Sequence, residues 1–186
     1  ALPIIETQAG DLSAYIPTNV ISITDGQIFL ESELFFSGQR PAVNVGLSVS
    51  RVGGAAQTKA MKKAAGSIRI DLAQYREMEV FTQFSSDLDE GTMKQLQHGR
   101  ALMELLKQPM SHPFSMAEQV IILVSANAHV FSDIELSKIK GFRADMLEFF
   151  HSQHSEIVNT IESTKDLTDE TKEAIIAAAN EFKSER

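Results

Sequence analysis

The sequence has no cysteine, no tryptophan and only five prolines. Without cysteine the chain forms no disulfide and offers no thiolate to a metal, which fits a reducing compartment. The longest apolar run, residues 120–124, is far shorter than the ~20 residues of a membrane-spanning helix, so direct membrane insertion is not expected. Acidic residues outnumber basic ones by 25 to 17, so a nucleic-acid partner is not expected either.

Two functional motifs are also missing. Residues 53–59 contain glycines, a threonine and a lysine, but not in the order of the phosphate-binding loop G-x-x-x-x-G-K-[ST]. His151 and His154 stand three positions apart without carboxylates at ligand spacing, and His98, His112 and His129 are scattered. The sequence therefore predicts no phosphate loop and no metal site.

What is present is a globular composition, with 43% hydrophobic and 23% charged residues in a chain of 186. That length suits one domain or one and a half. The chain runs from Ala1 straight into an apolar segment, residues 2–5, which we interpret as a buried strand. Because domains usually begin with a more polar lead-in, this start predicts a piece of a longer protein.

The first part of the chain has the pattern of strands and turns. Six of the ten glycines lie at or before Gly54. An Asp25-Gly26 pair predicts a hairpin between residues 20–23 and 28–30, although Pro17 could open a short helix before it. Apolar and polar residues alternate over positions 43–49, which predicts a half-buried strand.

After Gly54 the apolar spacing changes to steps of three and four, which indicates helices. A stripe over residues 61–84 predicts one long helix that Gly66 could kink, and Ser115 with Glu118 forms a capping box. Further helices are expected over residues 89–107, 115–130, 134–152, 153–163 and 168–184. We therefore predict a first domain, residues 1–57, and a helical domain of about five to six helices, residues 58–186.

Arg51 stands at the seam between these two patterns. It is one of only two basic residues in the first 57 positions, Arg40 being the other. A lone cation at a strand end beside Gly53 and Gly54 is a plausible anion contact. A structural salt bridge with a nearby carboxylate, Asp25 or Glu31, explains it equally well.

Several stretches resemble the α subunit of F-type ATP synthases. The likeness is carried by residues 17–30, Arg40-Pro41-Ala42 and residues 45–59, and it continues through residues 72–77, 86–89 and 104–108. It covers essentially the whole chain and thins after about Ala126. The run Ser-Val-Ser-Arg-Val-Gly-Gly, residues 48–54, is more typical of α than of the catalytic β subunit.

The resemblance implies a mixed fold: the last strands of an α/β RecA-like nucleotide-binding domain, without its phosphate loop, followed by the whole C-terminal helical domain. It implies that Arg51 is an arginine finger that acts in trans at the catalytic site of β. Ser22 and Gly26 match the α segment that approaches the same phosphate pocket.

Other positions match the non-catalytic nucleotide site of α itself. Arg40, Pro41 and Gln108 correspond to residues that line its adenine pocket. The family often has a second glutamine two positions after Gln108, where this chain has Met110.

The resemblance also implies a surface that faces the rotor. Asp87, Asp89 and Glu90 correspond to the helix-turn-helix tip that faces the rotating γ subunit. A helix N-cap explains these acidic residues equally well.

The partners implied are the β subunit in an alternating α/β ring, the γ rotor and a delta/OSCP-type stator subunit. The cofactors implied are ATP or ADP with Mg²⁺ in the full complex, whose activity is that of a proton-transporting two-sector ATPase. The chain alone is expected to bind none of them firmly and to be inactive. The location implied is peripheral, on the cytoplasmic face of a bacterial plasma membrane or the matrix or stromal face of an organelle.

Two other interpretations remain open from the residues. One is a stand-alone helical protein-interaction module. The other is the tail of a different hexameric RecA-like motor, such as an export ATPase or a transcription-termination helicase, although the helicase predicts a basic pore and this chain has no basic cluster there.

Overall fold

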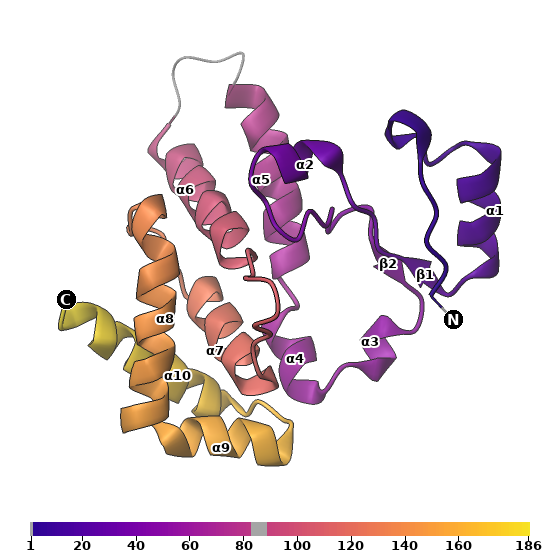
Figure 1. Ribbon diagram of the computed structural model, residues 1–186. Helices are drawn as coiled ribbons and strands as arrows, with labels where there is room; N and C mark the ends of the chain where they lie inside the picture. The colour runs from indigo at the N-terminus through magenta and orange to yellow at the C-terminus, as the bar shows by residue number, and fades with distance from the viewer. Residues whose placement is uncertain (1, 83–88) are drawn as a thin grey trace. The chain divides into compact units, whose positions relative to one another are not determined.

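The computed structural model describes residues 2–82 and 89–186, and its contacts divide the chain into two units, Ala1–Ala56 and Gln57–Arg186. The first unit contains short helices and one two-stranded sheet, and the second is helical (Figure 1). This mixture of a short strand-containing part and a larger all-helical part confirms the predicted fold class.

The first unit contains five elements besides a single 3₁₀ turn at Gln8–Gly10. Its helices are α1 (Tyr15–Ile23), α2 (Ser32–Phe36) and α3 (Gly53–Ala56). Strand β1 (Gly26–Gln27) pairs antiparallel with β2 (Val49–Ser50), and Gly26 lies opposite Ser50. The sheet therefore brings together the two segments that contain Gly26 and Arg51.

Two of the predicted strands are wrong. Residues 2–5 form no strand, and the side chains of Leu2 and Ile4 are 95% and 96% exposed. A buried strand needs neighbours to pair its backbone, and the only strands in the described part of this unit pair with each other. Residues 20–23 belong to α1 rather than to a hairpin, because the short helix that was expected only before residue 20 continues through Ile23.

The alternating segment, residues 43–49, also departs from the prediction. Only its last residue belongs to a strand, and Val43 forms an isolated bridge with Leu30. Asn44 is the cause, because its buried side chain accepts a hydrogen bond from the backbone N–H of Leu47 at 3.0 Å and donates to Glu31 Oε1 at 2.8 Å. An asparagine that bonds the backbone three residues later bends the chain into a turn.

The second unit contains seven helices in its described residues: α4 (Lys59–Ala64), α5 (Ile68–Thr82), α6 (Glu90–Leu105), α7 (Met116–Asn127), α8 (Leu136–Gln153), α9 (Ser155–Thr164) and α10 (Asp169–Ser184). Helix α7 lies at the centre, in contact with α4, α6, α9 and α10 (Figure 1). Its residues Val120, Ile121 and Val124 are fully buried, because neighbouring helices cover α7 on several sides. The capping box of Ser115 and Glu118 is also present.

The predicted helix over residues 61–84 is two helices, so this unit has one more than expected. Helix α4 ends at Ala64, and α5 starts at Ile68 after a turn that contains Gly66. The turn is fastened to the end of α7, because Asn127 Nδ2 donates to the carbonyl of Ala64 at 2.9 Å and Ser67 Oγ lies 3.0 Å from Asn127 Oδ1. These side-chain bonds replace backbone bonds that a continuous helix would make.

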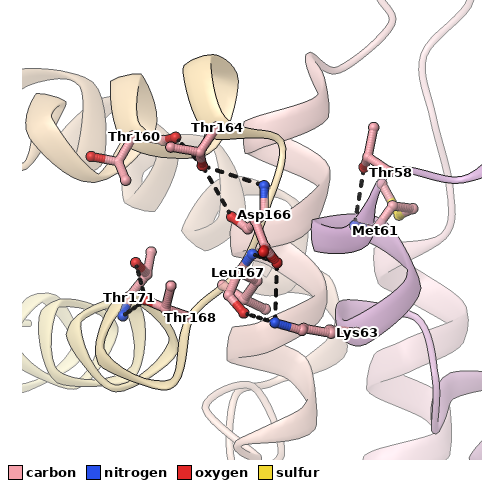
Figure 2. A network of polar contacts seen from close by, with 9 residues as sticks. All are labelled: Thr58, Met61, Lys63, Thr160, Thr164, Asp166, Leu167, Thr168 and Thr171. Carbon is pink, nitrogen blue, oxygen red and sulfur yellow. Dashed lines mark hydrogen bonds and ion pairs between the residues drawn. The ribbon is translucent and has the colours of Figure 1, made fainter.

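Figure 2 shows how α4 is fastened to the loop between α9 and α10. Lys63 Nζ donates to Asp166 Oδ1 at 3.0 Å and to the carbonyl of Leu167 at 2.5 Å. The hydrogen bond from Lys63 lowers the pKa of the Asp166 carboxyl. The first helix of this unit is thereby joined to its last two, which closes the bundle around α7.

Candidate functional site

Arg51 follows β2 directly, and its backbone is fixed on both sides. Its N–H donates to the carbonyl of Asp25 at 2.8 Å, one residue before β1. The N–H of Gly53 donates to Ser50 Oγ at 2.8 Å, which fixes the turn into α3. These bonds hold the main chain of Arg51 in place beside the sheet. The residue itself is exposed, so its guanidinium is accessible.

The guanidinium of Arg51 forms no ion pair within the described residues of the first unit. Asp25 meets Arg51 only through the backbone, where the carbonyl of Asp25 accepts from the main-chain N–H of Arg51. The carboxylate of Glu31 accepts a hydrogen bond from Asn44. The salt-bridge hypothesis for Arg51 is thus wrong for both named carboxylates. An exposed arginine with no carboxylate of its own is suited to bind an anion from another molecule.

Gly26 and Ser22 lie on the segment that leads into the sheet. A Cβ on Gly26 would stand 2.2 Å from the carbonyl oxygen of Val49, so only glycine fits where β1 meets β2. Its role here is to let the two strands approach, rather than to turn a hairpin. Ser22 is exposed on the last turn of α1, and its hydroxyl donates to the carbonyl of Asn19 at 2.7 Å. Gly26 and Arg51 are thus brought together by the sheet, whereas the hydroxyl of Ser22 bonds to a carbonyl of its own helix.

Arg40 and Pro41 follow α2 in the first unit. Both are exposed, and the Arg40 guanidinium lies over the ring of Phe35, 4.5 Å from its centre. Stacking on an aromatic ring holds a guanidinium in one orientation, and the N–H groups at its edge stay available to bind other groups. Gln39, just before it, is buried and fixes the chain through its N–H bond to the carbonyl of Leu34.

Gln108 belongs to the second unit, on the exposed loop after α6. The loop is held by a buried arginine that was not among the residues predicted from the sequence. Arg143 on α8 donates through one guanidinium nitrogen to the carbonyls of Leu105 and Lys107, at 2.9 and 3.0 Å, and it lies 4.8 Å from the ring centre of Phe114. Burial lowers the pKa of Arg143.

A signal for Arg143 was present in the sequence. It stands within the apolar spacing of α8, beside Ile139, Phe142 and Met146, where a charged residue is out of place. Such a cation has to satisfy buried acceptors, and the last carbonyls of a neighbouring helix are the common ones.

The acidic tip is only partly described, because Asp87 lies outside the described residues. Asp89 caps α6: its carboxylate accepts from the N–H of Thr92 at 3.2 Å and from the Thr92 hydroxyl, and the hydroxyl bond lowers the pKa of Asp89. Glu90 pairs with Lys94 one turn along, at 2.7 Å. Both carboxylates therefore stabilise the first turn of α6.

The histidines are arranged differently from what their sequence positions suggested. His151 pairs with Glu118 at 3.1 Å, and His154 lies 3.4 Å from Glu156, so these two face different carboxylates. His98 and His129, which are 31 positions apart, lie in contact with each other. No pattern in the sequence relates the last two, because their contact depends on how α6 packs beside the end of α7.

Comparisons with known proteins agree with the resemblance. The family model "ATP synthase alpha/beta chain, C terminal domain" matches residues 57–182, and "ATP synthase alpha/beta family, nucleotide-binding domain" matches residues 1–50. The ATP synthase subunit alpha of Caldanaerobacter subterraneus subsp. tengcongensis is 56% identical over 183 residues, which are 98% of this chain and 36% of that protein. The chain therefore spans little more than a third of that curated relative, and it belongs to the ATP synthase alpha/beta family.

Proposed function

We propose that this chain is the C-terminal part of the α subunit of an F-type ATP synthase, and that Arg51 acts in trans as an arginine finger at the catalytic site of the β subunit. The observation that carries this proposal is the state of Arg51: its backbone is held beside β1, its side chain is exposed, and no carboxylate in the described first unit neutralises it. The identity to a subunit alpha favours this over an interaction module or another motor.

The chemistry follows from the guanidinium. During phosphoryl transfer, negative charge spreads over the oxygens of the γ-phosphoryl group, and planar N–H donors stabilise it. A neighbouring carboxylate would compete for those donors, and Arg51 has none among the described residues of its unit. The bond from its N–H to Asp25 fixes where the side chain starts, so less freedom is lost when it binds.

The other residues of the first unit would assist. Gly26 keeps β1 and β2 close enough to hold Arg51, and Ser22 would offer its exposed hydroxyl to the same phosphate pocket. Mg²⁺ would not be held by this part of the chain. Arginine has no lone pair for a metal, and the described residues contain no cluster of three histidines or carboxylates around one point.

Arg40, Pro41 and Gln108 are proposed to contact the adenine of ATP or ADP at the non-catalytic site of α. Arg40 is already ordered by Phe35, and the Gln108 loop is ordered by Arg143. The phosphates of that nucleotide would be held by the part of the subunit that carries the phosphate loop.

The proposed partners are the β subunit, the γ rotor and a delta/OSCP-type stator subunit, in a complex that couples ATP synthesis to proton transport. Asp89 and Glu90 would face γ. The proposed location is peripheral, on the cytoplasmic face of a bacterial plasma membrane or its organellar equivalent. Over the described ranges, no helix combines the length and apolar character that crossing a bilayer requires.

The test is an Arg51→Ala substitution in a full-length α subunit that ends in this sequence, reassembled with β and γ. Because the arginine stabilises charge that develops in the transition state, we expect ATP hydrolysis to fall by ~10³-fold or more while nucleotide binding persists. Arg51→Lys should also lose most of the rate, since an ammonium lacks the planar fork of donors.

Lys140→Ala is a suitable control, because it removes a cation from the exposed side of α8 and should leave the rate unchanged. Gel filtration of each complex shows whether the ring assembles. An Arg51→Ala ring that hydrolyses ATP at the full rate refutes the finger assignment. Hydrolysis by the 186-residue chain alone would refute the whole proposal.

A further inference from the structure

Three side-chain donor atoms converge at one end of the helical unit. His98 Nδ1 on α6 and His129 Nδ1, just after α7, are 3.1 Å apart. The hydroxyl oxygen of Ser132 lies 3.4 Å from each of them. The three atoms form a nearly equilateral triangle, with the two rings tilted by 55° and their centres 4.2 Å apart.

The backbone around His129 and Ser132 is held firmly in place. His129 has a left-handed backbone, with φ of 58°, and its N–H donates to the carbonyl of Ala126 at 2.9 Å. The N–H of Ser132 donates to the carbonyl of His129 at 3.2 Å. Val130, between them, is 1% exposed and anchors this turn in the core. The turn therefore holds His129 and Ser132 in a fixed position relative to each other.

His98 is fixed from the other side. It precedes Gly99, the position at which α6 lies against the ring of Tyr75 on α5. His98 is half-buried and His129 is exposed, so the triangle can be reached from solvent. The negative charge of Asp71 on α5 acts electrostatically on His98.

The triangle has the dimensions of a metal site. Zinc–nitrogen bonds of ~2.0–2.1 Å at tetrahedral angles place neighbouring ligand atoms about 3.3 Å apart. The observed separations of 3.1, 3.4 and 3.4 Å lie on either side of that value. We propose that His98, His129 and Ser132 form a binding site for one divalent late-transition-metal ion, with water completing its coordination.

The class of ion follows from the donors. Imidazole nitrogens suit Zn²⁺, Cu²⁺ and Ni²⁺, whereas Mg²⁺ and Ca²⁺ prefer sites built from oxygen. The site offers two nitrogen ligands and one weak oxygen ligand. We therefore expect it to bind Cu²⁺ more tightly than Zn²⁺. The site lies outside the residues assigned to nucleotide, and the proposal stands independently of the function of Arg51.

The competing explanation is a neutral pair of histidines that share one hydrogen bond between their Nδ1 atoms. That pair needs one Nδ1 to carry a proton, while a metal needs both lone pairs free. The two explanations therefore differ in what a metal titration shows.

Calorimetric titration of the 186-residue chain with zinc chloride tests the proposal, with copper chloride as the second probe. We expect saturable binding of one ion per chain, with tighter binding of Cu²⁺. His98→Gln and His129→Asn should each weaken binding at least tenfold. Asparagine tolerates the left-handed backbone at position 129, so this variant should keep the turn intact.

The double variant His151→Gln/His154→Gln serves as the control, since it removes two histidines outside the triangle and should leave zinc binding unchanged. Far-ultraviolet circular dichroism confirms that each variant is folded. The proposal is overturned if no stoichiometric binding occurs, if His98→Gln and His129→Asn bind zinc like the original chain, or if only the control variant loses binding.

Discussion

At the scale of single residues, Tyr75 is a buried phenol whose ionisation is opposed by its surroundings. Burial, followed by the hydrogen bond that its hydroxyl donates to Glu79 at 2.7 Å, raises the pKa of Tyr75 to about 12. In the unfolded chain a tyrosine ionises near ~10. Between these values the unfolded state binds fewer protons than the folded state, so stability should fall as the pH rises from ~10 to ~12.

The chain is well suited to this measurement, because it has two tyrosines and no tryptophan. In a Tyr15→Phe variant, phenolate absorbance reports Tyr75 alone, and its midpoint should lie near 12 while the chain stays folded. Tyr75→Phe should weaken the dependence of unfolding free energy on pH in this range. A midpoint close to that of free tyrosine would show that Tyr75 is neither buried nor bonded to Glu79 in solution.

Arg143 is a second residue whose substitution should have a measurable effect on stability. It donates to the carbonyl of Leu105, the last residue of α6, and to that of Lys107 on the following loop, although the residue is only 5% exposed. Arg143→Met keeps most of the apolar length but leaves both acceptors without their donor. Hydrogen bonds to charged groups contribute ~1.5–3 kcal/mol each, so we expect the free energy of unfolding to fall by about 2 kcal/mol or more.

Chemical denaturation measures this loss, and Arg143→Lys provides a graded comparison. A lysine offers one point charge, which cannot span the carbonyls and stack on Phe114 at once, so its loss should be intermediate. If Arg143→Met is as stable as the original chain, the buried guanidinium does not hold the Gln108 loop.

At the scale of elements, most helices of the second unit were predictable from the sequence, whereas the strands were not. The capping box of Ser115 and Glu118 acts locally, and it is formed at the predicted position. The strand at residues 43–49 failed because the side chain of Asn44 overrides an alternating pattern. The stripe over residues 61–84 failed because periodicity continues across Gly66, while the bonds that break the helix come from Asn127, far away in sequence.

The candidate site was also predictable only in part. Arg51 was identifiable as a rare cation at a seam, but its lack of a carboxylate partner within the described first unit could be seen only in the structure. The contact of His98 with His129 had no sequence signal at all, since it joins α6 to the turn after α7. Contacts between elements depend on how the elements pack. The apolar period of a helix shows only which of its faces is buried, and not which residues that face meets.

The packing of α5 on α6 depends on Gly99. A Cβ at this position would lie 2.3 Å from the ring of Tyr75, and the ring is buried against the backbone of α6. Gly99→Ala should force the two helices apart and lower the free energy of unfolding by ~1–3 kcal/mol, the usual cost of overpacking. This loss must exceed the gain of about 1 kcal/mol that alanine gives within a helix.

Gly141 on α8 is the matched control, because it is an exposed helical glycine where an added Cβ would meet no atom within 4 Å. Gly141→Ala should therefore stabilise the chain by up to about 1 kcal/mol. Thermal unfolding of both variants compares the same substitution at two sites. Equal effects would mean that the Tyr75 ring moves aside without cost.

At the scale of the whole molecule, the two units differ in how much they bury. The described residues of the first unit include few buried side chains, namely Pro17, Phe29, Gln39, Ala42 and Asn44. The second buries fully the large residues around α7, including Phe131, Phe150, Met146 and Ile161. Apolar burial is the main favourable term in folding, so the stability of the chain should reside in the second unit.

This difference predicts that residues 57–186 fold without residues 1–56. In guanidinium, the shortened chain should keep one cooperative transition in helical circular dichroism, because its core and the bonds of Lys63 to the α9–α10 loop are all retained. Residues 1–56 alone should show no cooperative transition, since so small a core cannot offset the entropy of ordering the chain. If the shortened chain instead loses its transition, the helical unit depends on the first unit for its stability.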